Sequence, residues 1–170
     1  MTAEQFVPNV EQLLANNAVY VEQFHDPDHA VAPTRRLAVV ACMDSRIDTF
    51  QVLGLGIGEA HIIRNAGGVI TDDVIRSLCL SQRLLGTREI VLVHHTDCGL
   101  QKVTDASFKA ELFADVGMKP DWAVEAFTDP HADVRQSIER LHSTPFLSHK
   151  EHIRGFVYDV NDGHLASVKA

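Results

Sequence analysis

Three residues that can bind a transition metal lie in two short motifs of the chain. Cys42 opens the string CMDSR at 42–46, and His95 and Cys98 open and close the string HTDC at 95–98. Zinc is bound readily by thiolate sulfur and imidazole nitrogen, and three protein ligands with one open position are typical of a catalytic zinc site. The spacing therefore predicts one zinc ion per chain, held by Cys42, His95 and Cys98.

A carboxylate and a guanidinium follow the first of these ligands, at Asp44 and Arg46. Taken alone, Asp44 is also explained as a carboxylate that caps a turn. A guanidinium within reach would instead lock this carboxylate into a two-pronged hydrogen bond, which favours a paired role beside the metal. We expect Asp44 and Arg46 to act together in catalysis.

The cysteines and histidines of the chain also have structural interpretations that compete with metal binding. A free cysteine after a buried strand is commonly a small core residue, and Cys42 becomes a convincing ligand only together with the second motif. Cys79 has no partner at ligand spacing, so it is predicted to pack in the core. His94 and His95 are consecutive in a predicted strand and must point to opposite faces, and the spacing to Cys98 favours His95 as the ligand.

The elements that position these motifs can be read from the apolar patterning. Valine-rich runs at 36–41 and 89–94 are typical of strands buried on both faces, and 61–64 is a shorter strand. Helical spacing appears at 9–24, 72–85, 105–116 and 131–142, whereas Gly54, Gly56 and Gly58 indicate a turn-rich stretch. The segments 153–160 and 165–168, separated by Asn161-Asp162-Gly163, predict a hairpin.

Strands that alternate with helices predict an α/β fold, an open and mainly parallel sheet flanked by helices, with an antiparallel edge at the C-terminal hairpin. In such sheets ligands bind beyond the carboxyl ends of the strands, where both motifs begin. We expect a single domain overall, with an N-terminal helical arm at 1–35 and a zinc-binding catalytic part at 36–170. The helix at 9–24 is amphipathic and separated from the sheet by a loop that includes Asp26-Pro27-Asp28, so it can pack on a neighbouring chain.

A glycine-containing segment follows the second strand at Asn65-Ala66-Gly67-Gly68. Glycines at this end of the sheet let backbone N–H groups approach a small anion, although a plain strand-to-helix turn explains them as well. Ala66, Gly67 and Gly68, together with Ser45, are the candidate substrate or anion site.

Composition narrows the class of protein further. A net charge of −8 over 170 residues argues against a nucleic-acid partner, and no stretch is long and apolar enough for a membrane span. The first twenty residues carry acidic and amide side chains, and three cysteines do not make a disulfide framework. We therefore expect a cytoplasmic protein.

The motifs resemble those of the β-class carbonic anhydrases. The resemblance rests on CMDSR at 42–46, RNAG at 64–67 and HTDCG at 95–99, in that order, and on the closing run GFVYDV at 155–160. It covers the chain from about 36 to 168, and the short length is most similar to the small archaeal and actinobacterial members.

The resemblance implies zinc bound by Cys42, His95 and Cys98, and a catalytic pair of Asp44 and Arg46. It also implies reversible hydration of carbon dioxide to bicarbonate and a proton, because zinc lowers the pKa of bound water and provides hydroxide near neutral pH. The family is known in a second, closed arrangement in which the counterpart of Asp44 is a fourth zinc ligand. Its sites lie between subunits, so we expect a homodimer or a dimer of dimers.

Two other functions use the same residues. Hydrolysis of a related heteroallene, carbon disulfide or carbonyl sulfide, needs the same ligands and differs only in the access path. A non-catalytic zinc or redox-sensing protein would be expected to close the site with a fourth Cys or His, and none is spaced for it.

Overall fold

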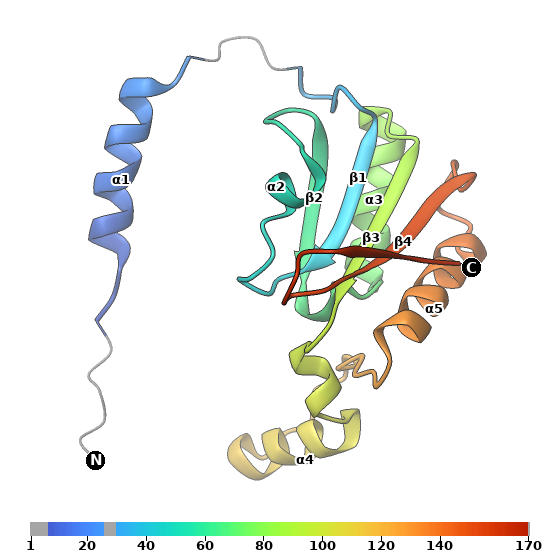
Figure 1. Cartoon of the computed structure of the whole chain (residues 1–170). Helices are drawn as coiled ribbons and strands as arrows, with labels where there is room; N and C mark the ends of the chain where they lie inside the picture. The colour runs from blue at the N-terminus through green and yellow to red at the C-terminus, as the bar shows by residue number, and fades with distance from the viewer. Residues whose placement is uncertain (1–6, 26–29, 170) are drawn as a thin grey trace.

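The protein forms a five-stranded sheet of order β2-β1-β3-β4-β5 in the computed structural model, which describes residues 7–25 and 30–169 (Figure 1). The strands are β1 (Leu37–Cys42), β2 (Ala60–Asn65), β3 (Glu89–His95), β4 (His152–Tyr158) and β5 (Leu165–Val168). The first four are parallel, and β5 pairs antiparallel with β4 at the edge. The predicted fold class is confirmed, including the C-terminal hairpin.

The helices are α1 (Val10–Gln23), α2 (Thr49–Leu53), α3 (Asp72–Leu85), α4 (Asp105–Val116) and α5 (Pro130–Ser143). The ends of α3 follow the predicted signals, since the Thr71 side chain accepts from the backbone N–H of Val74 and Gly86 ends the helix with a left-handed φ of 73°. Two short 3-10 turns, Ala66–Gly68 and Gly99–Lys102, follow β2 and β3.

One element differs from the prediction. The turn-rich stretch predicted from Gly54, Gly56 and Gly58 is present, but residues 49–53 before it form a helix that was not predicted, α2, whose N-cap Asp48 accepts hydrogen bonds from the backbone N–H groups of Phe50 and Gln51. Gly54 ends this helix with a φ of 62°. A helix of five residues is too short to display a helical apolar period, which is why patterning alone does not detect it. The predicted loop at Asp26-Pro27-Asp28 lies outside the described residues.

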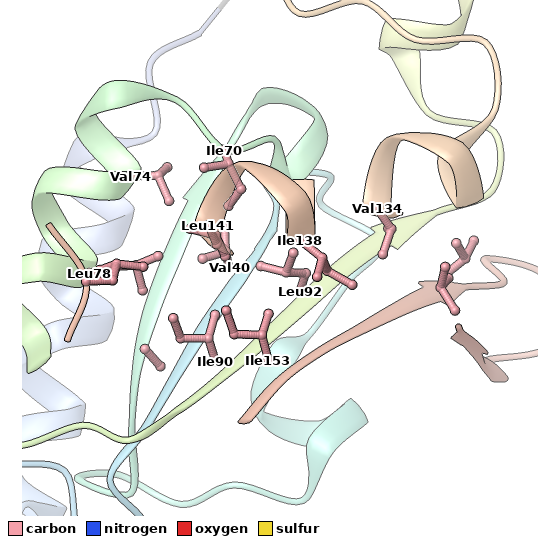
Figure 2. Packing of buried hydrophobic residues seen from close by; sticks show 14 residues of the cluster. Val40, Ile70, Val74, Leu78, Ile90, Leu92, Val134, Ile138, Leu141 and Ile153 are labelled. Carbon is pink, nitrogen blue, oxygen red and sulfur yellow. The ribbon is translucent and has the colours of Figure 1, made fainter. Parts of the chain in front are cut away.

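The main core lies between one face of the sheet and helices α3 and α5 (Figure 2). Val40, Ile90, Leu92 and Ile153 point from the strands toward the two helices. The other face of the sheet carries a second cluster around Val39 and Val93, which α2 and the following loop cover in part. All six residues of β1 are buried, as expected for a central strand buried on both faces.

Helix α1 stands apart from the sheet in Figure 1, and none of its residues is buried. Its large apolar side chains are half exposed or more, among them Val10, Leu13, Leu14, Tyr20 and Val21. No helix in the described ranges has the length and apolar character needed to cross a membrane.

Candidate metal centre

The two predicted motifs meet at the carboxyl ends of the central strands. Cys42 is the last residue of β1 and His95 the last of β3, and these strands are direct neighbours in the sheet. Cys98 lies in the turn after β3. The two Sγ atoms and one imidazole nitrogen of these residues lie within 4.8 Å of one another, and all three side chains are buried. The chain continues from β1 to β2 on one side of β1, and then crosses back to β3 on the other side. The strand order therefore reverses between β1 and β3, and the cluster occupies this switch point of the sheet.

The tautomer of His95 suits a metal ligand. Its Nδ1 lies 2.8 Å from the carbonyl oxygen of Thr96, which can only accept, so Nδ1 carries the hydrogen. Nε2 is therefore an unprotonated acceptor, and it is buried without a hydrogen-bond partner. A buried polar atom without a partner is costly, and coordination of a cation would satisfy it. Two sulfurs and one imidazole nitrogen are a donor set that fits zinc.

The two thiols have pKa shifts of opposite direction. The hydrogen bond from the Cys98 thiol lowers the pKa of Cys42 against the effect of burial, with further help from His95. The same contact with Cys42, together with burial, raises the pKa of Cys98. Burial acts to lower the pKa of His95, but the close approach and negative charge of the Cys42 sulfur outweigh it, and the net shift is upward. Cysteine binds zinc as the thiolate, so metal binding would release the proton of Cys98.

The carboxylate of Asp44 is held beside this cluster by Arg46. The guanidinium donates from Nε to Oδ1 at 2.9 Å and from Nη2 to Oδ2 at 2.7 Å, and the backbone N–H of Arg46 donates to Oδ1 as well. Hydrogen bonds from Arg46 hold the pKa of Asp44 far below its usual range, and the pKa of Arg46 is raised in return. Oδ2 of Asp44 lies 3.8 Å from Nε2 of His95, so the ionised carboxylate faces the ligand cluster.

Residues that sequence reasoning did not single out hold this arrangement in place. Arg64 of β2 donates from Nε to the carbonyl oxygen of Cys42 at 2.9 Å and from Nη2 to that of Asp44 at 2.6 Å. The backbone N–H of Cys98 donates to the side chain of Gln101 at 2.9 Å. The arginine opens the RNAG string, but its role depends on the pairing of β1 with β2.

A second carboxylate contacts Arg46 from the other side. Asp97 accepts from Nη1 of Arg46 through Oδ2 at 3.0 Å, and its own carbonyl oxygen accepts from Nη2 at 3.1 Å. Lys102 lies 2.8 Å from the remaining oxygen of Asp97. The order of charges across these turns is therefore Asp44, Arg46, Asp97, Lys102, alternating in sign.

The predicted anion segment lies beside Cys42, because Asn65 is paired with Cys42 in the β1–β2 register. Gly67 and Gly68 are buried and have φ values of 80° and 71°. A Cβ atom on Gly68 would lie 2.8 Å from the backbone nitrogen of Cys42, so this glycine permits a close approach of two backbones. Ala66 is exposed. Packing therefore explains Gly68, whereas the anion-binding role of the segment stays a prediction.

Ser45 is exposed in the turn that follows β1, where it lines a hollow of about 270 Å³. Its other lining side chains include Ile47, Phe50, Ile62 and Arg64. Asp48 and Thr49 line it as well, so the hollow is of mixed polarity, and it adjoins the turn that carries Asp44.

The remaining two candidates lie away from the cluster. His94 faces the opposite side of the sheet, where its Nε2 lies 2.7 Å from Asp133 of α5 and its ring contacts Phe127. Cys79 packs against the main core. In the part of the chain that the structure describes, Cys42, His95 and Cys98 are the one group whose geometry could hold a metal.

An α/β sheet with a buried Cys-His-Cys cluster at its switch point, and an ionised carboxylate facing that cluster, defines the class of zinc-dependent α/β enzymes. A sequence model described as carbonic anhydrase matches residues 37–118. The chain is 50% identical over 158 residues to β-carbonic anhydrase 1 of Mycobacterium tuberculosis. The aligned region covers 93% of this chain and 96% of that protein. The chain therefore belongs to the β-carbonic anhydrase family, whose members are zinc-dependent lyases.

Two further similarities bear on the substrate. A crystal structure of carbonic anhydrase from Streptococcus mutans superposes with a TM-score of 0.90 at 40% identity, covering 97% of this chain and all of that one. A carbon disulfide hydrolase from Acidithiobacillus thiooxidans is 36% identical over 152 residues, covering 77% of this chain and 76% of that protein. The structural similarity agrees with the observed fold.

Proposed function

We propose that this protein hydrates carbon dioxide reversibly to bicarbonate and a proton, with one zinc ion held by Cys42, His95 and Cys98. The observation that carries the proposal is the convergence of these three buried ligand atoms within 4.8 Å, beside a carboxylate that Arg46 keeps ionised. When bound, zinc supplies a Lewis acid that lowers the pKa of water and so makes a nucleophile available near neutral pH. Similarity to β-carbonic anhydrase 1 supports the choice of carbon dioxide.

The chain's own residues have distinct roles in this proposal. Asp44, as an ionised acceptor, receives a hydrogen bond from the attacking oxygen and so fixes the direction of its lone pair. Arg46 holds Asp44 in place and keeps it ionised. The hydrogen bond from His95 Nδ1 to Thr96 keeps the ring oriented and its Nε2 free to coordinate.

Asp44 has a second available role. Its Oδ2 lies 3.8 Å from Nε2 of His95, and a carboxylate oxygen is itself an acceptable zinc ligand. We propose that Asp44 is the fourth ligand in a closed, inactive arrangement, and that its pairing with Arg46 opposes this arrangement. Ser45, Ala66, Gly67 and Gly68 are proposed to line the path of the substrate or product anion.

A stopped-flow assay of carbon dioxide hydration, combined with metal analysis, tests the proposal. Asp44→Asn keeps the size of the side chain but removes the ionised acceptor, so zinc should be retained while turnover falls on the order of a hundredfold. Wild-type turnover in Asp44→Asn would show that the paired mechanism is wrong here.

The same preparation separates the rival substrate. Release of hydrogen sulfide from carbon disulfide at a higher rate than hydration of carbon dioxide would assign the chain to the hydrolase activity instead. The higher identity and coverage of the β-carbonic anhydrase relative favour carbon dioxide. Absence of both activities in protein with full zinc content would favour a non-catalytic role.

We also propose that the protein is a homodimer or a dimer of dimers, in which residues 1–35 form an arm that packs on a second copy and residues 36–170 form the catalytic part. The support is α1, which has no buried residue although it carries Leu13, Leu14 and Tyr20. Leu14→Glu should weaken the assembly in light scattering at micromolar concentration, whereas Glu11→Gln should not. A wild-type protein that is fully active as a monomer would contradict the proposal.

A cytoplasmic setting is part of the same proposal. Cys42, Cys79 and Cys98 are all free thiols, and two of them are proposed ligands that oxidation would remove. Cell fractionation that recovers the protein outside the cytoplasm would contradict it.

A further inference from the structure

Asp97 has an unusual backbone conformation in the turn between the two ligands His95 and Cys98. Its φ is 55°, in the left-handed region where residues other than glycine are uncommon and aspartate is one of the tolerated exceptions. Three contacts from cationic side chains hold it there, two from Arg46 and one from Lys102. The conformation is thus fixed by side chains that belong to the surroundings of the site.

Arg46 links Asp97 to the metal centre. One edge of its guanidinium donates two hydrogen bonds to Asp44, and the other side contacts the carboxylate and the carbonyl oxygen of Asp97. The guanidinium is planar and rigid, so a fixed position of one edge also fixes the direction of the other. The side chain of Arg46 is 43% exposed, so contacts with the protein rather than burial must determine its orientation.

We infer that Asp97 is a positioning residue for the reaction, acting through Arg46 to keep Asp44 directed at the ligand cluster, and that Lys102 orients Asp97 in turn. The inference rests on the proposed function. Without the Asp97 carboxylate, Arg46 loses the hydrogen bond at Nη1, and its hold on Asp44 becomes looser. Asp44 then spends more time away from the orientation that Arg46 imposes, including on the metal itself.

A simpler role for Asp97 is to tie its turn to the turn that carries Asp44. The substitution Asp97→Asn separates the two roles. Asparagine tolerates the left-handed conformation, and the carbonyl contact with Nη2 of Arg46 stays because it belongs to the backbone. A tie between turns would therefore survive, whereas the charge that orients the guanidinium is removed.

The expected result for Asp97→Asn is unchanged zinc content and melting temperature, with kcat/KM for carbon dioxide lowered by roughly tenfold, as expected when a neutral amide replaces the carboxylate that pairs with a guanidinium. The matched control is Asp73→Asn, because Asp73 also pairs with an arginine, Arg76, at 2.8 Å, and lies at the start of α3. The control should keep the kcat/KM of the wild type. Equal kcat/KM in Asp97→Asn and the wild type would overturn the inference.

A double-mutant cycle tests whether Asp97 acts through Arg46. In an Arg46→Ala background, Asp97→Asn should cause no further loss of kcat/KM, because the intermediary is absent. Losses that multiply would overturn the inference, since Asp97 would then act on its own. If Asp97→Asn does not fold, Lys102→Met tests the same order of contacts, and it should lower kcat/KM by a smaller factor that also disappears in the Arg46→Ala background.

Cobalt-substituted protein gives a readout that does not depend on turnover. Asp97→Asn should change the visible absorption spectrum of bound cobalt, and the change should disappear when Asp44 is also replaced by asparagine. Identical spectra of the wild type and Asp97→Asn would overturn the inference even if the protein is an active carbonic anhydrase. A wild-type protein without activity would instead refute the proposed function, while the spectra would still decide the role of Asp97.

Discussion

Replacement of Gly68 by alanine tests how closely the segment after β2 must approach the metal centre. The new Cβ atom would lie 2.8 Å from the nitrogen of Cys42, 3.0 Å from the carbonyl carbon of Ala41 and 3.1 Å from the carbonyl oxygen of Val93. All three are backbone atoms of central strands, so none can move aside as the end of a side chain can. The substitution should therefore displace the backbone that carries the first ligand.

Two effects contribute to the expected destabilisation. A left-handed φ costs alanine about 1–2 kcal/mol, and overpacking in a dense interior costs about 1–3 kcal/mol more. The sum is about 2–5 kcal/mol of the free energy of unfolding. Gly86→Ala is the matched control, because Gly86 has a φ of 73° but nothing lies within 4 Å of its added Cβ atom. Gly86→Ala should therefore lose only the free energy of unfolding that the left-handed φ costs, about 1–2 kcal/mol.

Urea denaturation of both variants, with zinc bound and at one fixed zinc concentration, measures the difference. Gly68→Ala should be less stable than Gly86→Ala by about 1–3 kcal/mol, the overpacking part alone. It should also bind zinc more weakly, because Cys42 moves. Equal stability losses and equal zinc affinities in the two variants would refute the close-approach argument.

Three further predictions concern the metal, the core and pH. Cys98→Ala should lose zinc in metal analysis while Cys79→Ala keeps it, and the opposite outcome would defeat the ligand assignment. Gly155→Ala should lower the free energy of unfolding by about 1–3 kcal/mol, because its Cβ atom would overlap a valine methyl carbon of α5, and an unchanged urea midpoint would contradict this. Backbone hydrogen bonds, first that from Ala126, lower the pKa of Asp105, so the stability that its ionised form provides is complete above about pH 4 and is lost as the pH falls through the lowered pKa. Denaturation across a pH series should therefore show Asp105→Asn to be less stable than the wild type at neutral pH, with the gap narrowing in acid.

The sequence predicts most of the fold because its signals are local. The valine-rich runs of β1 and β3, the capping Thr71 and the terminating Gly86 each act within a few residues, and each appears in the structure as expected. Helix α2 escaped prediction because five residues are too few for an apolar period, and its signal is one capping carboxylate at Asp48.

Part of the site is predictable from the sequence, and part depends on the folded structure. Residue type and the carboxyl-end rule for parallel sheets suffice to bring Cys42, His95 and Cys98 together. The contact between Arg46 and Asp97 joins residues 51 positions apart, and its geometry depends on the pairing of β1 with β3 and on a left-handed φ at Asp97. A sequence lists these residues but carries no local signal for their contact, so only the folded chain identifies it.

The sheet order has a consequence for how this protein acquires its metal. The parallel pairings that join β1, β2, β3 and β4 connect segments separated by crossovers, and such non-local pairings form late and slowly in folding. His95 and Cys98 share one turn and are near each other even in the unfolded chain, but Cys42 joins them only after β1 has docked on β3. Zinc should therefore prefer the native chain strongly, and by mass action the melting temperature should rise with the free zinc concentration. Chains without zinc lack this stabilisation of the β1–β3 pair, so they should unfold more readily than chains that hold the metal.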